Sequence, residues 1–467
     1  MMNQKLAIAV FSALVAMWAL PAVADEPAKA TPETLLDAIK QGKPLTNFRL
    51  RYENVDQEGF QPAPNVAKKL DTAHAFTLRS LIGWQTAPFN NFSFAAQITD
   101  VHEFNDNFND RRGNLTEVGK SNFPNIVDPG FTDINQLYVD WTGIKNTKLR
   151  LGRQQLNLDN VRFIGDIGFR QNMQVFDGIS VLNKSIPDTE IFAAHFDQVR
   201  QINTQLRQGN IDIVNAKYRI SPSESLVGYG YFIDVANLSQ NGGDPSKGST
   251  VAQGGNGLGA SSDAAATRSA TTDASSKTFG VRLDGARKVS DDWKVLYTVE
   301  YAKQDDYAGG NSLIDAHYLK LGGGAAYGVW SLRIDHEVLS SNNGRYAFQT
   351  PLGTNHLFQG WADVFLATPR QGMEDTFVTF AGSIEKAKLY AEYHVFKSDE
   401  RYQSLNGQLG DKYGTELDLS VTYPFTKEIT AKLEYANFNE GDVYGTKAGA
   451  ARKGDKEIVW VTGMYTF

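Results

Sequence analysis

The sequence predicts an all-β fold, namely a transmembrane antiparallel β-barrel of about 18 strands with short periplasmic turns and long extracellular loops. Three observations predict it. The chain ends in a strand pattern that stops on an aromatic residue, because Val459, Val461, Tyr465 and Phe467 share one face. The N-terminus resembles an export signal, and apolar and polar residues alternate between the two ends. Only helices and closed barrels satisfy their backbone groups in lipid, so this pattern favours a barrel.

Residues 1–24 are predicted to be a signal peptide. Lys5 gives a positive start, an apolar run extends from Leu6 to Leu20, and Ala22-Val23-Ala24 provides a small-residue cleavage site. The run is too short and wrongly flanked for a membrane helix. The chain contains no cysteine, so we expect no disulfides in the oxidising compartment beyond the inner membrane.

The mature chain is predicted to have three parts. Residues 25–45 form a short periplasmic segment, in which residues 34–40 can make one or two helical turns before Gly42 and Pro44. Residues 46–467 form the barrel. Within it, residues 237–276 are rich in Gly, Ala, Ser and Asn, so we expect a mobile extracellular loop there.

The alternation of residues predicts which side chains face lipid. Leu332 and Ile334 alternate with Arg333 and Asp335, as in a barrel that is apolar outside and wet inside. Short turn segments separate many of the strands, at Pro88–Asn91, Gly143–Asn146, Ser221–Glu224, Ser290–Asp292 and Thr426–Glu428. A soluble all-β sandwich also alternates and stays open as an alternative. The long strands and the regular exchange of short turns and long loops favour the membrane barrel.

An even strand number places both chain ends in the periplasm. A barrel of this size is too wide for side chains alone to fill, so it contains a channel or a plugged lumen. The expected location is therefore the outer membrane of a Gram-negative cell. Expected partners are the lipid bilayer with its lipopolysaccharide and the barrel-assembly machinery. A formal net charge of −7 argues against nucleic acid as a partner.

The densest polar motif runs from residue 149 to residue 178 and contains Arg150, Arg153, Arg162 and Arg170. Guanidinium groups bind carboxylates through two parallel hydrogen bonds, so the motif can form a carboxylate-binding constriction. It can equally form an internal charge ladder, in which Asp159 and Asp177 pair with these arginines and brace a loop. The sequence leaves both interpretations open.

At this motif the chain resembles the alginate-export family of outer-membrane barrels. Three stretches carry the resemblance, Gly152-Arg153-Gln154, Arg162-Phe163-Ile164-Gly165 and Phe176-Asp177-Gly178, and a second region comprises Ala347–Leu352 and Phe358–Asp363. The resemblance implies a monomeric barrel of eighteen strands whose arginine-lined lumen passes an anionic polyuronate. The resemblance also implies basic residues on several inward strands, and this sequence fits that placement with Arg49, Arg51, Arg79, Lys148, Arg150, Lys217, Arg219, Arg282 and Arg333. It departs from the family in acidic residues that also point inward, namely Glu300, Asp335, Glu337, Glu392, Glu416, Asp418 and Glu434.

The segment from Ala347 to Leu366 is long and rich in aromatic residues for a solvated loop. It either folds into the barrel mouth and narrows it, or lies flat over the rim as a lid. Trp361 and the nearby Arg370 could stack and bind sugar rings, which is a hypothesis that substitution of both residues tests through solute flux.

Catalysis is not expected. His336 and Ser340 share a face of one strand but lie about 13 Å apart, too far for a histidine to activate a serine. The remaining histidines show no metal-ligand spacing, and the Asn and Asp residues between Asn105 and Asp110 fit no calcium-loop template. We therefore expect no catalytic residue, metal or cofactor.

The expected function is a channel for anionic solutes, with uronate (alginate-like) oligosaccharide or polysaccharide as the favoured cargo. Arg150, Arg153, Arg162 and Arg170 are the first candidates for its selectivity. Further candidate lining residues are Arg79, Arg219, Arg282, Arg333, Arg370, Asp159 and Trp361. A general nutrient porin is the first alternative. A non-conducting barrel that serves as a scaffold or adhesin is the second.

Overall fold

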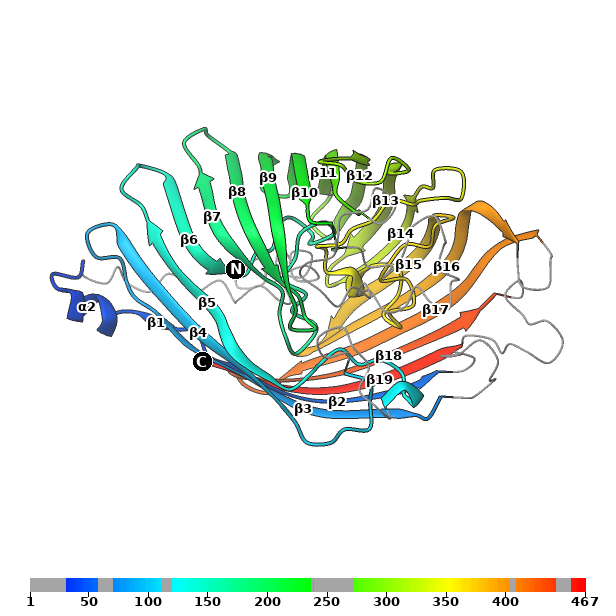
Figure 1. Cartoon of the computed structure of the whole chain (residues 1–467), viewed down its shortest axis with the longest axis horizontal. Coiled ribbons are helices and arrows are strands. Elements are labelled where there is room, and N and C mark those ends of the chain that lie inside the picture. Colours follow the sequence, from blue (N-terminus) through cyan, green and yellow to red (C-terminus); the bar gives the residue numbers. More distant parts are fainter. Residues whose placement is uncertain are drawn as a thin grey trace.

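Eighteen antiparallel strands form a closed barrel in the computed structural model of the chain (Figure 1). The structure describes residues 31–57, 70–110, 120–236, 238, 273–403, 409–441 and 455–467. The first nine wall strands are β2 (Asn47–Gln57), β3 (Ala73–Gln85), β4 (Phe92–Glu103), β5 (Phe131–Trp141), β6 (Thr147–Gln154), β7 (Val175–Asn183), β8 (Thr189–Arg200), β9 (Leu206–Ser221) and β10 (Glu224–Asp234). The other nine are β11 (Ser276–Lys288), β12 (Trp293–Asp306), β13 (Asp315–Tyr327), β14 (Trp330–Leu339), β15 (Met373–Ile384), β16 (Ala387–Gln403), β17 (Leu409–Pro424), β18 (Ile429–Glu440) and β19 (Lys456–Thr466).

The ring closes where the last strand pairs with the first. β19 lies antiparallel to β2, with Thr466 opposite Asn47. The predicted short turns all lie at this end of the barrel, and the long connections lie at the other end. Both ends of the wall are therefore on the short-turn side, which is periplasmic in barrels of this kind. The predicted fold class is confirmed.

Four small elements accompany the wall among the described residues. The helix α2 (Leu35–Lys40) and the two-residue strand β1 (Lys43–Pro44) precede β2, and β1 pairs with the periplasmic end of β3. Two short 3₁₀ helices, η2 (Lys120–Asn122) and η3 (Asn355–Leu357), lie in connecting loops. Within the described ranges, no helix has the length and apolar character that crossing a bilayer requires.

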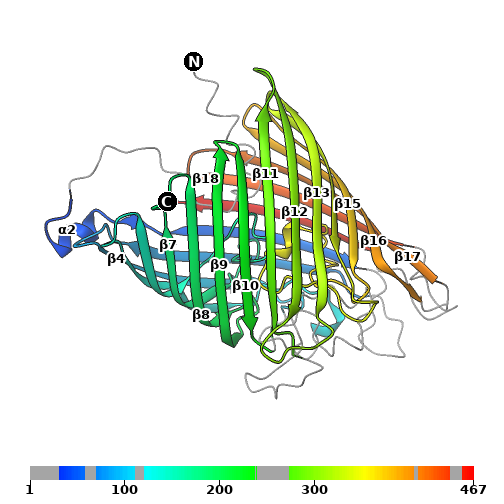
Figure 2. The ribbon, with the colours of Figure 1, turned by 90° about the horizontal axis from the view of Figure 1, so that it is seen from above.

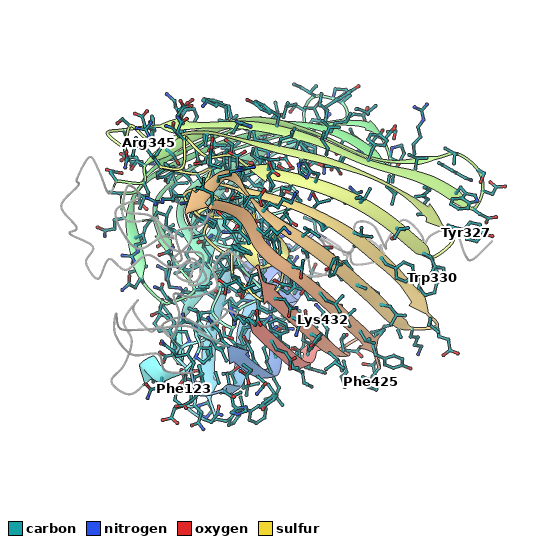
Figure 3. The ribbon with its side chains drawn as sticks, turned by 90° about the vertical axis from the view of Figure 1, so that its right-hand side faces the viewer. Phe123, Tyr327, Trp330, Arg345, Phe425 and Lys432 are labelled. Atoms are coloured by element: carbon teal, nitrogen blue, oxygen red, sulfur yellow. The ribbon has the colours of Figure 1, made fainter. Side chains whose placement is uncertain are left out.

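The outer face is apolar because alternate residues of each strand point outward. On β14, Leu332 and Ile334 are exposed, whereas Asp335 is buried on the inner side. Aromatic side chains gather at the periplasmic rim, where Tyr327, Trp330 and Phe425 lie in Figure 3, while Phe123 and Arg345 lie at the loop end. Such an aromatic girdle is typical of a membrane-water interface. The apolar outer face and its girdle mark the part of the wall that contacts lipid.

Substituting a lipid-facing residue by arginine tests this assignment. Ile334 lies in the middle of β14, so we expect Ile334→Arg to lower the free energy of unfolding by about 2–4 kcal/mol. Urea unfolding in phospholipid bilayers measures it. Ser331→Arg places the same side chain on the inner face, where we expect a much smaller loss. Equal losses in the two variants would contradict the assignment.

Two predicted segments lie mostly outside the described residues. The signal peptide, residues 1–24, lies wholly outside them. Most of the loop predicted at residues 237–276 does too, although Asp273, Ala274 and Ser275 are described and buried, and Ser276 begins β11.

Candidate functional site

Two long loops fold into the barrel and pack against its inner wall. They are the β6–β7 loop (residues 155–174) and the β14–β15 loop (residues 340–372). Figure 1 shows the β14–β15 loop, drawn in yellow, between the two sides of the wall. Phe169, Phe348, Leu352 and Ala362 in these loops are all buried. We call the two loops together the plug.

The plug is one unit because its two loops share backbone hydrogen bonds. Ile164 and Leu352 form a parallel bridge, in which Gly165 N donates to Leu352 O at 2.9 Å. Thr354 N donates to Val161 O at 2.9 Å. The side chain of Gln174 adds bonds to the carbonyls of Gly165 and Leu352. A displacement of either loop therefore breaks bonds to the other.

Two arginines of β2 fasten the β6–β7 loop to the wall. Arg49 donates to Gly168 O at 2.7 Å and to Arg170 O, and its Nε donates to Gln171 Oε1 at 2.8 Å. Arg51 donates to Phe169 O at 2.7 Å and lies over the Phe169 ring. Both guanidinium groups are buried, so they hold the loop and are not available to a solute. Carbonyls are good partners for such groups because each accepts a charge-assisted bond.

Arg170 links both loops to the wall. Its Nη1 donates to Glu53 of β2 at 3.1 and 3.2 Å, and its Nη2 donates to Asp363 of the β14–β15 loop at 2.8 Å. Asp128 of the β4–β5 loop lies 3.7 Å away. Burial on its own lowers the pKa of Arg170, but these three carboxylates outweigh it and raise the pKa. The arginine is therefore always charged, and three separate parts of the chain meet at it.

Carboxylates of the wall hold the other loop through its backbone. Trp361 N donates to Asp418 Oδ2 at 3.1 Å, and Ala362 N donates to Glu416 Oε1 at 2.5 Å. Both acids belong to β17, and Gln359 of the loop donates to Glu337 of β14. The segment from Ala347 to Leu366 is thus packed inside the barrel, and the lid arrangement is excluded.

The plug also contains a buried His356–Asp363 pair, with Nδ1 and Oδ1 2.8 Å apart. Burial lowers the pKa of His356, and the opposing effect of Asp363 does not restore it. Burial would raise the pKa of Asp363, but His356 and Arg170 together lower it to about 2. At neutral pH the pair therefore consists of a neutral imidazole and a carboxylate, which also accepts from Arg170.

Acid is expected to loosen the plug through Asp363. Because its folded pKa of about 2 lies below the ordinary value of 3.8, its stabilising contribution is complete above pH 3.8 and disappears as the pH falls to 2. The contribution is about 2 kcal/mol. We expect wild-type single-channel conductance to rise between about pH 4 and pH 2. Asp363→Asn should conduct more at neutral pH and show no such rise, and an identical acid response in both proteins would contradict this.

At four places on the inner wall, a basic side chain is more exposed than the acidic side chain with which it pairs. Four inward ion pairs show this: Arg150 with Asp140 (2.6 Å), Lys320 with Glu337 (3.8 Å), Arg333 with Asp335 (2.8 Å) and Lys432 with Glu434 (2.5 Å). The cationic side chains are 12–16% exposed and the anionic ones 1–6%. Arg282 is the opposite case, since its partner Asp284 is the more exposed. At these four positions, lumen water meets mainly cations.

The first predicted motif is a cross-strand arrangement between β6 and β7. Gly152 lies opposite Gly178, Arg153 opposite Asp177 and Gln154 opposite Phe176. Gly152 has a φ of +124°, and a Cβ atom there would lie 2.2 Å from Leu137 O, so only glycine fits. The glycine of this motif is therefore required by the backbone conformation of the wall.

Of the four first candidates, Arg153 does not face the lumen. It shares a face with Leu151, which is exposed on the outside, and it binds Asp177 at 2.7 and 2.8 Å. Arg150 does face the lumen and stacks on Tyr138 at 3.6 Å. Arg162 is buried in the plug beneath Phe358, with Glu337 3.5 Å from its Nε.

The second candidates are spread over different depths and environments. Arg79 is buried, and its Nη2 donates to Asn47 at 2.8 Å, whereas its Nε and Nη1 have no hydrogen-bond partner among the described residues. Arg219 is exposed near the periplasmic end of β9. Asp159 accepts from Asn215 at 2.6 Å and lies 3.7 Å from Arg282.

The remaining candidates are Trp361 and Arg370. Trp361 is stacked on Tyr390, with ring centroids 5.2 Å apart, and is buried. Arg370 is half-buried at the end of the β14–β15 loop, where its carbonyl accepts from Ser341 Oγ. The contacts that the structure shows for these two residues are therefore made with different neighbours.

Lys320 and Lys432 were missed as candidates, although strand alternation could have found them. Lys320 lies two residues from the buried Tyr318, and Lys432 two residues from the buried Glu434. Both lie over plug aromatics, Lys320 5.8 Å from the Phe358 ring and Lys432 5.6 Å from the Trp361 ring. Figure 3 labels Lys432 on its strand.

The part of the chain that the structure describes shows no cluster of three or more His, Cys, Asp or Glu residues arranged to hold a metal ion. His336 faces outward and shares a hydrogen bond with Thr376 at 2.9 Å. Ser340 Oγ accepts from His317 N at 2.8 Å. His336 and Ser340 therefore form hydrogen bonds with different partners.

Comparisons with known proteins agree with this architecture. A family model of the Campylobacter major outer membrane protein matches residues 8–230, less than half of the 467 residues. OpdQ of Pseudomonas aeruginosa is similar in structure, with a TM-score of 0.62, 12% identity and coverage of 92% of this chain and 98% of that one. OccAB4 of Acinetobacter baumannii gives a TM-score of 0.60 at 11% identity, covering 92% and 99%.

A third similar structure is OpdK of Pseudomonas aeruginosa with vanillate, at a TM-score of 0.58, 12% identity and coverage of 90% and 97%. No curated protein sequence matches the chain. These comparisons do not support the resemblance to the alginate-export family, because the matching family model describes a different outer-membrane protein. At such identities the structural likeness shows a shared fold, which is the closed antiparallel barrel described above. Together with the family model, it confirms the predicted outer-membrane location.

Proposed function

We propose that the protein is an outer-membrane channel for small solutes that carry a carboxylate. The observation that carries the proposal is the inner wall, where Arg150, Lys320, Arg333 and Lys432 are each more exposed than the acid they pair with. A fixed cation beside pore water lowers the barrier for an anion. The paired acid behind it keeps the cation in place.

The plug favours small cargo over polymer. Its two loops are bonded to each other and to β2, β14 and β17, so they occupy the lumen as a fixed obstacle. The structure of OpdK with vanillate provides a related case, since that similar barrel is described with a small aromatic carboxylate. Uronate oligosaccharides also carry carboxylate groups but are longer, so they are the cargo against which the small carboxylates are compared.

Blocking of single-channel current tests the proposal. Benzoate, galacturonate, a galacturonate oligomer and neutral glucose are added in turn to one side of a bilayer that contains the protein. We expect an anion-selective current, blocked by benzoate and galacturonate and unaffected by glucose. Block by the oligomer alone would favour the polyuronate cargo.

The other outcomes decide between the alternatives. An unselective current that no solute blocks would overturn the proposal in favour of a general nutrient porin. No current at all, from protein that is correctly folded, would favour a scaffold or adhesin.

A further inference from the structure

The helix α2 presents apolar side chains at the periplasmic edge of the barrel that no other described residue covers. Leu35, Leu36 and Ile39 are 45–62% exposed, whereas Ala38 is buried. The three exposed residues lie on one face, because Ile39 follows Leu36 by three residues and Leu35 by four. Asp37 lies on the opposite face, and its backbone N–H donates to the Thr34 cap at 3.1 Å. The segment is therefore a small amphipathic helix.

The helix is fixed to the barrel. Ala87 N, in the β3–β4 turn, donates to Ala38 O at 2.9 Å, and Trp84 Nε1 donates to Ile39 O at 2.8 Å. The chain then pairs as β1 with β3, and Leu45 packs inside the mouth against Ala95 and Tyr138. These contacts hold α2 at the rim and leave its apolar face uncovered.

The rim at this point belongs to the lipid-facing surface. Trp84 shares its strand face with Ile82, which is exposed on the outside of the wall. Phe92 and Phe94 on β4 are exposed in the same way. Figures 1 and 2 both place α2 outside the wall, beside β4. The apolar face of α2 is thus continuous with the aromatic girdle through Trp84.

We propose that α2 is an interfacial anchor, which lies among the phospholipid headgroups of the periplasmic leaflet with Leu35, Leu36 and Ile39 toward the acyl chains. Exposed leucine and isoleucine are costly in water, and helices with such a face lie in the plane of a membrane interface. A tryptophan at the same level donates its N–H to the helix and leaves its ring to the lipid. The segment expected to be free in the periplasm is, by this proposal, part of the membrane contact.

Spin labels test the proposal cleanly because the chain has no cysteine of its own. Leu36→Cys is labelled in phospholipid vesicles, and its accessibility to oxygen, which concentrates in lipid, is compared with its accessibility to a water-soluble nickel complex. Leu332→Cys on the outer wall provides the lipid reference. Lys145→Cys in the exposed β5–β6 turn provides the water reference, and Asp37→Cys reports the opposite face of α2.

We expect the Leu36 label to prefer oxygen more strongly than the Asp37 and Lys145 labels do, at a depth of about 5–10 Å. Nickel accessibility equal to that of Lys145 would overturn the proposal, because α2 would then be in water. Protection from both reagents would also overturn it, because the face would then be covered by protein, such as a second copy of the chain.

A second variant separates the anchor from the channel. Replacing Leu35, Leu36 and Ile39 by serine, with the label at Lys40→Cys, should change the label from interfacial to water-like while the conductance stays that of the wild type. An unchanged label environment would contradict the anchor even if the labelled Leu36 variant failed to fold.

Discussion

Replacing Arg170 by glutamine is expected to open the channel while the barrel stays folded. The substitution leaves Glu53 and Asp363 buried with their shared cation removed, which costs about 3–5 kcal/mol for a buried ion pair. The wall has its own continuous hydrogen bonds, so the cost falls on the plug. We expect a larger and noisier single-channel conductance.

Arg219→Gln is the matched control, because this arginine is exposed at the periplasmic end and touches neither loop of the plug in any bond that the structure shows. Its conductance should stay close to that of the wild type. Heat-dependent gel mobility reports whether each barrel is folded. A folded Arg170→Gln barrel with unchanged conductance would show that Arg170 does not hold the plug.

Removing three lumen cations together is expected to reverse the ion selectivity. In the triple variant Lys320→Gln, Arg333→Gln and Lys432→Gln, Asp335 and Glu434 lose the cations that they pair with. Glu337 loses Lys320 and keeps Arg162 at 3.5 Å. One unit charge about 4 Å from a passing ion contributes on the order of 1 kcal/mol in water. We therefore expect the anion-to-cation permeability ratio to fall on the order of tenfold or more, as measured by the reversal potential in a salt gradient.

The double variant Lys320→Arg and Lys432→Arg keeps the charge at two of these positions and should keep the selectivity. A triple glutamine variant that still prefers anions would place the selectivity elsewhere. One such place is Arg79, whose Nε and Nη1 have no hydrogen-bond partner in the part of the chain that the structure describes. Loss of current altogether, with a folded barrel, would indicate a rearranged plug.

The wall could be predicted from the sequence because lipid imposes a simple period on it. In every strand that faces lipid on one side and water on the other, apolar and polar residues must alternate. The outward orientation of Leu332 and Ile334 can therefore be predicted from the sequence of their own strand alone. The same rule separates two of the predicted candidates. Arg150 and Arg153 are three residues apart on one strand, so they cannot both face the lumen.

The plug could not be predicted in the same way, because its bonds join distant parts of the chain. Arg170 meets Glu53 and Asp363, which are 117 and 193 residues away. Loops carry no period that reveals such partners. The aromatic composition of Ala347–Leu366 left two arrangements open, a segment folded into the barrel mouth and a lid over the rim. The carboxylates of β17 that accept from Trp361 N and Ala362 N are visible only in the structure.

The bridge between Ile164 and Leu352 also constrains the order of assembly. The β6–β7 loop is bonded to arginines of β2, and the β14–β15 loop is bonded to acids of β17. Because the two loops are also bonded to each other, the complete set of bonds requires both ends of the sheet to be close together. Contacts between such remote segments form late, since a long stretch of chain must first be ordered. The plug is therefore expected to gain its full set of bonds only when β2 and β17 have come together in the ring.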